Sequence, residues 1–575
     1  MDVQDYSSPG ADWLRVGTTP LERVRIPGGY LRWRVAKAGI GESITAPLTA
    51  PLLTFDLQGA ARAPAGMVAV RGGTLSDALA FVGWLGPYEL PTFFMDRFEV
   101  TNREYQSFVD KGGYTNRAYW KQPFVEGART LAWSEAMDRF RDATGRPGPS
   151  GWSGGHFPDG KGEYPVTGVS WFEAAAYAEF VGKELPVIAQ GYYAEPPDLD
   201  QYVMPLSNLS TTLAAVGTSR GLGVYGTYDL IGNAREWYWN DDGNGMRYTL
   251  GRQPASYGPE ALPAFDRSPL NGFRCVRNSA PLPKETLAPR PMLARDFSKA
   301  SPASDEAFRV YRAMYAYDPG PLNATVETVA ETSEDWRKEK VTFNAAYENQ
   351  RMMAYLFLPK HARAPYQAVA FFPSARVNFL TDSSGLGDLT FMDYVVQSGR
   401  AVIYPIYDGL YERHAAAPMV PGLTVVREQV VHWSKDLGRS IDYLLTRSDI
   451  DGSRLGYLGV SQGTAYGVNL AAVEQRIKAV VLLDGGFLQY EHSVEGLDPV
   501  DFAPRLTQPV LMVNGRFDAT FPIATAQLPL FRLLGAPATD KRHVVFETPH
   551  DVRLQRADMV KEVLAWYDRY LGRVQ

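Results

Sequence analysis

Six short apolar runs in the second half of this 575-residue chain limit its fold more than any other feature of the sequence. The runs are AVAFFP, AVIYPIY, LGYLGV, AVVLLD, PVLMVNG and HVVFE, at 368–373, 401–407, 455–460, 479–484, 509–515 and 543–547. Continuous apolar runs of this length are typical of parallel strands that are buried on both faces. The segment REQVVHWSKDLGRSIDYLLTR, between the second and third runs, has apolar residues three and four positions apart and predicts a helix. The pattern predicts a doubly wound, mostly parallel α/β sheet over residues 306–575.

The first part of the chain has a different pattern. Leu31, Trp33 and Val35 alternate with arginines after a Pro-Gly-Gly turn, which predicts a half-buried strand in a small β module over residues 1–60. Residues 61–277 are rich in Gly, Trp and Tyr and predict a loop-rich α+β domain.

One helix and one linker complete this organisation. The helix is predicted over 171–183, where the sequence reads WFEAAAYAEFVGK. Residues 278–305 contain five prolines, so we expect an interdomain linker with little regular structure.

Composition excludes several classes of function. Hydrophobic residues make up 45% of the chain and charged residues 21%, which is ordinary for a folded globular protein. The net charge of −6, without a run of five or more like charges, predicts no nucleic-acid partner. No stretch of 18 apolar residues is present, so the sequence predicts no membrane segment. We therefore expect a soluble protein, cytoplasmic if the chain is complete, with a small molecule as partner; a homo-oligomer stays open. A single cysteine, Cys275, excludes an internal disulfide and a multi-cysteine metal site.

The pattern Gly-x-Ser-x-Gly marks a nucleophilic serine only when it joins a buried strand to a helix. It occurs three times, around Ser153, Ser219 and Ser461. Ser153 and Ser219 lie in glycine-rich loops, which predicts a structural role for both. Ser461 directly follows LGYLGV and precedes a segment that can form a helix, so we predict that Ser461 is the nucleophile.

A serine nucleophile on this fold needs an acid and a histidine at the ends of later strands, because all three side chains must meet at one edge of the sheet. Asp518 follows PVLMVNG and His550 follows HVVFE, so both have the required order. Asp484, at the end of AVVLLD, is the rival acid. The order predicts catalysis by Ser461, His550 and Asp518 without a metal or cofactor.

Other residues are predicted to line the site. The backbone N–H groups of Gln462 and Ser374 are the expected oxyanion donors, with Ala375 as second choice for the latter. Arg376 and Tyr407 lie at strand ends, where they either bind substrate or serve as a solvated arginine and a packing tyrosine.

Long sequence strings indicate a family resemblance over nearly the whole chain. The first region resembles a PEGA-like module in the string VGTTPLERVRIPGGYLRWRV. The second region resembles a formylglycine-generating-enzyme-like domain in the strings PAGMVAVRGG, FEVTNREYQSFV, GNAREW and NGFRCVR. The third region resembles an α/β hydrolase in the strings HWSKDLGRSIDYL, GVSQG, PVLMVNGRFD and HVVFETPH. The same order follows the kinase domain in a group of bacterial serine/threonine protein kinases. No kinase motif is present, so the resemblance implies a fragment or a shortened relative.

The second domain departs from this resemblance. Formylglycine-generating enzymes hold copper with two cysteines before the closing motif, whereas here that stretch reads RYTLGRQPASYGPE. We therefore expect a non-catalytic domain with Cys275 as a packed thiol. Asn233 and Glu236 of GNAREW either support a calcium ion, as in related domains, or form a polar turn.

The third domain resembles the dienelactone hydrolase and prolyl oligopeptidase group. Serine stands at the position where true dienelactone hydrolases have cysteine, which implies ordinary carboxylic esters as substrates. We predict an esterase; a serine peptidase and a non-catalytic sensing or interaction segment remain alternatives.

Overall fold

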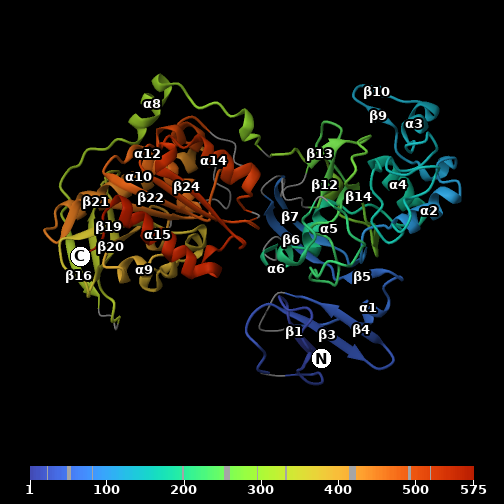
Figure 1. Ribbon diagram of the computed structural model, residues 1–575, viewed down its shortest axis with the longest axis horizontal. Coiled ribbons are helices and arrows are strands. Elements are labelled where there is room, and N and C mark those ends of the chain that lie inside the picture. The colour runs from blue at the N-terminus through green and yellow to red at the C-terminus, as the bar shows by residue number, and fades with distance from the viewer. Residues whose placement is uncertain are drawn as a thin grey trace. The chain divides into compact units, whose positions relative to one another are not determined.

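A computed structural model of the protein describes residues 1–21, 24–47, 53–79, 82–196, 200–210, 212–251, 260–293, 295–329, 333–413, 423–489, 494–518 and 520–574. The chain divides into two compact units, residues 1–294 and 295–575 (Figure 1). The division lies within the predicted linker, and both the predicted β module and the predicted α+β domain belong to the first unit. Among the described residues, no helix is long and apolar enough to cross a membrane.

The first unit begins with a four-stranded antiparallel sheet of order β2-β1-β3-β4. Its strands are β1 (Asp2–Asp5), β2 (Leu14–Arg15), β3 (Leu31–Lys37) and β4 (Gly41–Thr45). Val3, Leu31 and Trp33 form its buried core. Strand β3 includes the predicted alternating residues, and burial of their apolar side chains explains why the segment is extended.

The rest of the first unit consists of short elements joined by loops. Its strands are β5 (Met67–Val70), β6 (Gly73–Leu79), β7 (Gly83–Leu90), β8 (Phe93–Asp96), β9 (Val125–Glu126), β10 (Arg129–Thr130), β11 (Arg235–Asp241), β12 (Met246–Leu250), β13 (Glu260–Pro263), β14 (Asn271–Gly272) and β15 (Val276–Asn278). Its helices are α1 (Leu57–Ala61), α2 (Asn102–Asp110), α3 (Trp133–Arg139), α4 (Trp171–Phe180), α5 (Ile188–Ala194), α6 (Asp200–Val203) and α7 (Lys284–Leu287). Helix α4 begins at Trp171, as predicted, and the Ser170 hydroxyl caps it by accepting the Glu173 N–H. The helix ends at Phe180, three residues before the predicted end, because Gly182 has a left-handed conformation.

The second unit is built on a nine-stranded mixed sheet of order β16-β17-β18-β20-β19-β21-β22-β23-β24. Its strands are β16 (Thr325–Val329), β17 (Trp336–Asn344), β18 (Arg351–Pro359), β19 (Tyr366–Phe372), β20 (Ala401–Ile406), β21 (Ile450–Val460), β22 (Ile477–Leu483), β23 (Val510–Gly515) and β24 (Lys541–Phe546). The six strands from β19 to β24 are the six apolar runs, and they are mutually parallel. Strands β16, β17 and β18, which the sequence analysis did not predict, add an antiparallel edge.

Helices cover both faces of this sheet (Figure 1). They are α8 (Asp305–Tyr315), α9 (Asp393–Gln397), α10 (Leu423–Leu445), α11 (Gln462–Ala465), α12 (Gly467–Val473), α13 (Pro499–Phe502), α14 (Leu528–Leu533) and α15 (Arg556–Tyr570). Helices α10 and α12 pack on one face, while α9 and α15 pack on the other and are joined by an ion pair between Arg556 and Asp393. The carboxyl ends of the six parallel strands therefore meet at one edge, between the two helical layers.

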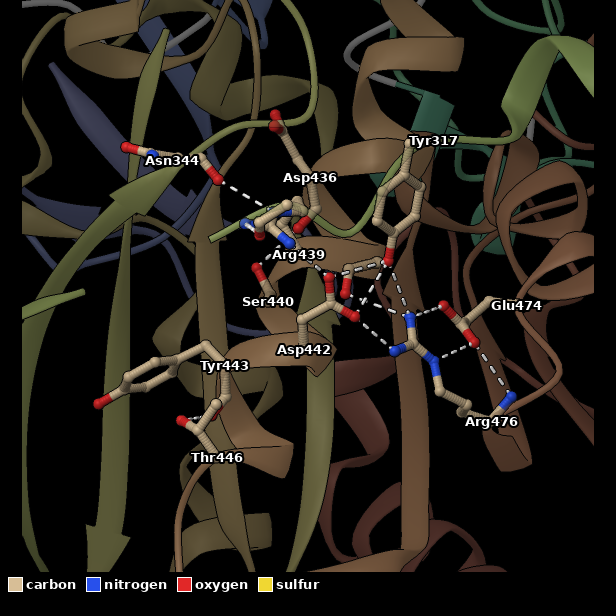
Figure 2. A network of polar contacts seen from close by, with 12 residues as sticks. Tyr317, Asn344, Asp436, Arg439, Ser440, Asp442, Tyr443, Thr446, Glu474 and Arg476 are labelled. Atoms are coloured by element: carbon tan, nitrogen blue, oxygen red, sulfur yellow. Dashed lines mark hydrogen bonds and ion pairs between the residues drawn. The ribbon is translucent and has the colours of Figure 1, made fainter. Parts of the chain in front are cut away.

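Helix α10 is fixed to its neighbours by a network of charged side chains (Figure 2). The carboxylate of Asp442 accepts hydrogen bonds from Arg439 (2.8 Å), Arg476 (2.6 Å) and the hydroxyl of Tyr317 (3.1 Å). The side chain of Arg439 is only 2% exposed and also donates to the carbonyl of Asn344. Asp442 thus neutralises two guanidinium groups and joins α10 to segments that lie far apart in the sequence.

The Asp442→Asn variant should lower the free energy of unfolding of the second unit by about 3 kcal/mol, because it leaves the buried Arg439 without a neutralising charge. Urea unfolding of the full chain, followed by hydrogen exchange and mass spectrometry of peptides from the second unit, measures the change. Asp558→Asn, on the exposed side of α15, is the matched control and should change the urea midpoint little. Equal midpoints for the two variants would contradict this role of Asp442.

Candidate active site

Ser461 lies at the sharp turn where strand β21 ends and helix α11 begins. Its backbone has φ 53° and ψ −105°, a conformation that residues with side chains rarely adopt. Such strain costs on the order of 1–3 kcal/mol and persists only where the surroundings impose it. The turn lifts the Ser461 side chain out of the strand, toward the edge where the parallel strands end.

Two glycines make this turn possible. A Cβ atom on Gly459 would lie 2.0 Å from the carbonyl oxygen of Gly463, and one on Gly463 would lie 2.4 Å from the carbonyl oxygen of Phe372. Both distances are far below van der Waals contact, so each position requires glycine. Thr464 adds support, because its hydroxyl lies within hydrogen-bond distance of the carbonyls of Gly459 (3.0 Å) and Leu483 (2.7 Å).

The structure brings together the three predicted residues of the site. The Oγ of Ser461 lies 2.9 Å from Nε2 of His550, and Nδ1 of His550 lies 2.8 Å from Oδ2 of Asp518. Oδ1 of Asp518 accepts the backbone N–H groups of Thr520 (2.9 Å) and Phe521 (2.8 Å). The Asp518 side chain is fully buried, whereas the His550 side chain is 32% exposed. A fixed carboxylate thus holds an imidazole that faces both the serine and solvent.

The charges around His550 favour its protonated form. Burial by itself lowers the pKa of the imidazole. The charge of Asp518 and its hydrogen bond raise this pKa by more than burial lowers it, and Asp484 and Asp551 raise it by smaller amounts. The result is a pKa of about 9, above the ordinary 6.5. An imidazolium at this position is therefore strongly stabilised.

Asp484, the rival acid, lies in the same cluster but makes a different hydrogen bond. It follows β22 directly, is 1% exposed, and accepts the backbone N–H of Val552 at 3.0 Å. Asp518 is the residue that bonds to the Nδ1 atom of His550.

The structure changes the order of preference for the second oxyanion donor. The N–H of Ser374 donates to the carboxylate of Asp388 at 2.8 Å, so this first-choice group is already engaged. In the described part of the chain, neither the N–H of Ala375 nor that of Gln462 has a protein acceptor. Ala375, the second choice, thus replaces Ser374 as the predicted donor beside Gln462.

Arg376 and Tyr407 have different environments. Arg376 is exposed at the start of the short helical turn after β19, and its substrate contact stays a prediction. Tyr407 is fully buried; its ring stacks on Phe372 with centroids 4.1 Å apart and its hydroxyl donates to the carbonyl of Phe371. These surroundings are those of a packing tyrosine, and a substrate contact of Tyr407 stays a prediction.

Two residues that the sequence analysis missed hold the loops around Ser461. Asp388 fixes Ser374, and the side-chain amide of Asn378 donates to the side-chain oxygen of Gln462 at 3.0 Å. Neither residue belongs to a motif or follows a strand directly. Their roles depend on loop conformations that no periodicity in the sequence predicts.

The two other Gly-x-Ser-x-Gly serines have structural surroundings. Ser153 belongs to a tight turn whose backbone pairs with His156. The hydroxyl of Ser219 donates to the carboxylate of Asp229. Neither hydroxyl is hydrogen-bonded to a histidine among the described residues.

The side chains of Asn233 and Glu236 in the first unit contact other protein groups. Glu236 forms two hydrogen bonds with the buried Arg274, at 2.7 and 2.6 Å, and the amide of Asn233 donates to Glu99. Asn233 lies in a bend with a positive φ, and Glu236 lies in strand β11; both side chains are engaged with other protein groups. Cys275 is fully buried, and burial raises the pKa of its thiol; most of the cysteine-free stretch RYTLGRQPASYGPE lies outside the described residues.

Comparisons with known proteins identify relatives of the first unit. Residues 55–204 match the family described as the sulfatase-modifying factor enzyme 1-like domain. Hercynine oxygenase of Mycolicibacterium smegmatis is 26% identical over 215 residues, covering 33% of this chain and 46% of that protein. Formylglycine-generating enzyme of Thermomonospora curvata is 29% identical, covering 33% of this chain and 78% of that protein. Serine/threonine-protein kinase pkn1 of Chlamydia caviae is 26% identical, and the match covers 26% of this chain and 22% of that protein. The chain thus spans about half of the first relative and about a fifth of the kinase.

Among solved structures, an acetyl xylan esterase from Paenibacillus sp. R4 is similar to this chain. The two proteins are 16% identical, and their superposition covers 47% of this chain and 96% of the esterase, with a TM-score of 0.38. The chemistry of the second unit is therefore inferred from its own geometry.

The Asp518→Asn variant should lower the pKa of His550 by one unit or more, because it removes the charge that chiefly raises this pKa. NMR titration of histidine-labelled protein measures the change. Since the folded-state pKa of about 9 exceeds the ordinary 6.5, the imidazolium–Asp518 pair stabilises the fold fully below about pH 6.5, and this contribution is lost as the pH rises through about 9. The control is Asp558→Asn, and an unshifted titration in Asp518→Asn would contradict the pairing.

Proposed function

We propose that the second unit is a serine hydrolase that cleaves carboxylic esters through an acyl-enzyme intermediate. The observation that carries this proposal is the hydrogen-bonded chain from Ser461 through His550 to Asp518, at the edge where the parallel strands end. A serine hydroxyl is a weak nucleophile until a base removes its proton, and the imidazole is within reach to do so.

The proposed reaction uses only groups of this chain and water. As Oγ of Ser461 attacks the ester carbonyl, its proton passes to Nε2 of His550, and Asp518 stabilises the imidazolium. The tetrahedral intermediate collapses, the C–O bond to the alcohol breaks, and His550 returns the proton to the departing alkoxide. A water molecule then repeats the sequence on the acyl-enzyme and releases the acid and free Ser461.

The oxyanion of each tetrahedral intermediate needs two hydrogen-bond donors. We assign them to the backbone N–H of Gln462, at the first position of α11, and the backbone N–H of Ala375. Each such donor is typically worth about 3 kcal/mol in the transition state. Arg376, exposed on the same turn as Ala375, is proposed to contact the substrate.

For the rest of the chain we propose supporting roles. Residues 1–60 form a PEGA-like module, and residues 61–277 a formylglycine-generating-enzyme-like domain that does not perform oxidation by a cysteine pair, since the chain has one cysteine and it is buried. The proposed linker is 278–305, and the hydrolase belongs to the dienelactone hydrolase group over 306–575.

A fluorophosphonate probe should form one adduct, on Ser461, because such probes react with activated serines. Intact mass and peptide mapping identify the site. Ser461→Ala should abolish labelling, and His550→Ala should slow it on the order of 10⁴-fold, since the hydroxyl loses its base.

Ser153→Ala is the matched control, because it removes a serine from the same sequence pattern outside the site; it should label like the wild type. Hydrolysis of p-nitrophenyl acetate against peptide p-nitroanilides then separates an esterase from a peptidase. A folded protein that forms no adduct would support the non-catalytic alternative instead.

A further inference from the structure

A second buried carboxylate lies beside the imidazole of the proposed site. One oxygen of Asp484, one oxygen of Asp518 and one ring nitrogen of His550 all lie within 4.8 Å of one another. The backbone of Asp484 has φ 47°, a left-handed conformation that a non-glycine residue adopts uncommonly. Strands β22 and β23 are neighbours, so their ends place the two acids side by side.

Asp484 also holds the loop that carries His550. Both of its carboxylate oxygens are within hydrogen-bond distance of the N–H of Val552, at 3.0 and 3.2 Å. Val552 follows His550 by two residues, so this contact limits where the imidazole can lie. The charged groups that act on Asp484 are His550, Asp518 and Asp551, together with Arg553, which is paired to Asp551.

Two carboxylates this close together in a buried site cannot both ionise without a large energetic cost. Burial is the main cause that raises the pKa of Asp484 to about 8; the charges of Asp518 and Asp551 raise it too, and His550 lowers it. Asp518 is the carboxylate bonded to the imidazole and to two backbone N–H groups. At neutral pH the carboxyl of Asp484, with its raised pKa, is therefore largely protonated, while Asp518 is the carboxylate that contacts the imidazole.

We propose that Asp484 is a reserve positioning residue for His550, which ionises and pairs with the imidazolium when Asp518 cannot supply the charge. Removing the charge of Asp518 also removes its repulsion, so Asp484 gives up its proton to solvent more easily. A change of side-chain rotamer then brings the carboxylate to the imidazole. The catalytic consequence depends on the proposed esterase function; the electrostatic coupling does not.

The kinetic test compares kcat/KM for p-nitrophenyl acetate among variants in which Asp484, Asp518 or both are replaced by Asn. Asn at position 484 keeps an oxygen that can accept the Val552 N–H. Loss of the acid from a complete triad typically costs about 10⁴-fold. We expect Asp518→Asn to lose only about 10²-fold, and Asp484→Asn/Asp518→Asn to lose about 10⁴-fold. The control Asp518→Asn/Asp558→Asn should match Asp518→Asn alone. Equal activity of the single variant and the Asp484-containing double variant would overturn the proposal.

The pH dependence provides a readout that a merely structural role would not affect. In Asp518→Asn, kcat/KM should rise with pH in two steps, one from ionisation of Asp484 and one from loss of the His550 proton. The step from Asp484 should vanish in Asp484→Asn/Asp518→Asn. A single step that is the same in both variants would count against the proposal.

A second measurement decides the coupling even if the protein hydrolyses no ester. In the Ser461→Ala background, NMR titration should give a His550 pKa at least one unit higher in Asp518→Asn than in Asp484→Asn/Asp518→Asn. If the double variant does not fold, Asp484→Asn alone should still lower the pKa of His550 relative to the parent. Identical titrations would refute the role of Asp484, whereas an unlabelled and inactive wild type would refute the esterase function only.

Discussion

The turn at Ser461 is the constraint on which the rest of the proposed active site depends. A strand must change into a helix within one residue, and the carbonyl groups of Gly463 and Phe372 leave no room for a side chain at either flanking glycine. Burial of β19 and β21 on both faces fixes the two backbones, so the strain at Ser461 is sustained by the apolar core of the sheet. The geometry of the proposed site is consequently set in part by residues of the sheet core.

The same edge concentrates negative charge around one imidazole. Asp518, Asp484 and Asp551 all raise the pKa of His550, although burial acts in the opposite direction. An environment that favours the imidazolium suits the intermediate step of acyl transfer, when the histidine carries the proton taken from serine. It also reduces the neutral fraction of the resting base at neutral pH, so the extra carboxylate would be costly if it were ionised as well. A proton on Asp484 removes that residue's share of the effect, whereas Asp518 continues to favour the imidazolium.

Most of the second unit could be predicted because its strands are continuous apolar runs. The six parallel strands and the residues at their ends, including Ser461, Asp518 and His550, follow from that pattern together with chain order. Strands β16 to β18 were missed: β17 alternates between buried and partly exposed residues and so has no continuous apolar run. Strand β18 (RMMAYLFLP) is a continuous apolar run like the six that were predicted, and it was overlooked. The loop after β19 was only partly predictable, because the Ser374 N–H donates to Asp388, a residue fourteen positions away whose approach depends on tertiary structure. Tyr407, for which the sequence left substrate contact and packing open, follows β20 directly and is buried against Phe372, because a residue at a strand end can face the core.

The two units illustrate why polar residues in a motif do not by themselves identify a site. In the first unit, Glu236 is neutralised by Arg274 and Lys183 is paired with Asp96, so these charges serve the fold. In the second unit, the buried carboxylate of Asp518 is bonded to a histidine that remains one-third exposed and touches a serine under backbone strain. What distinguishes the second arrangement is that its chain of hydrogen bonds ends at a serine hydroxyl rather than closing on itself. The proposed chemistry therefore rests on the edge of the large sheet, whereas the charges named in the first unit belong to closed ion pairs.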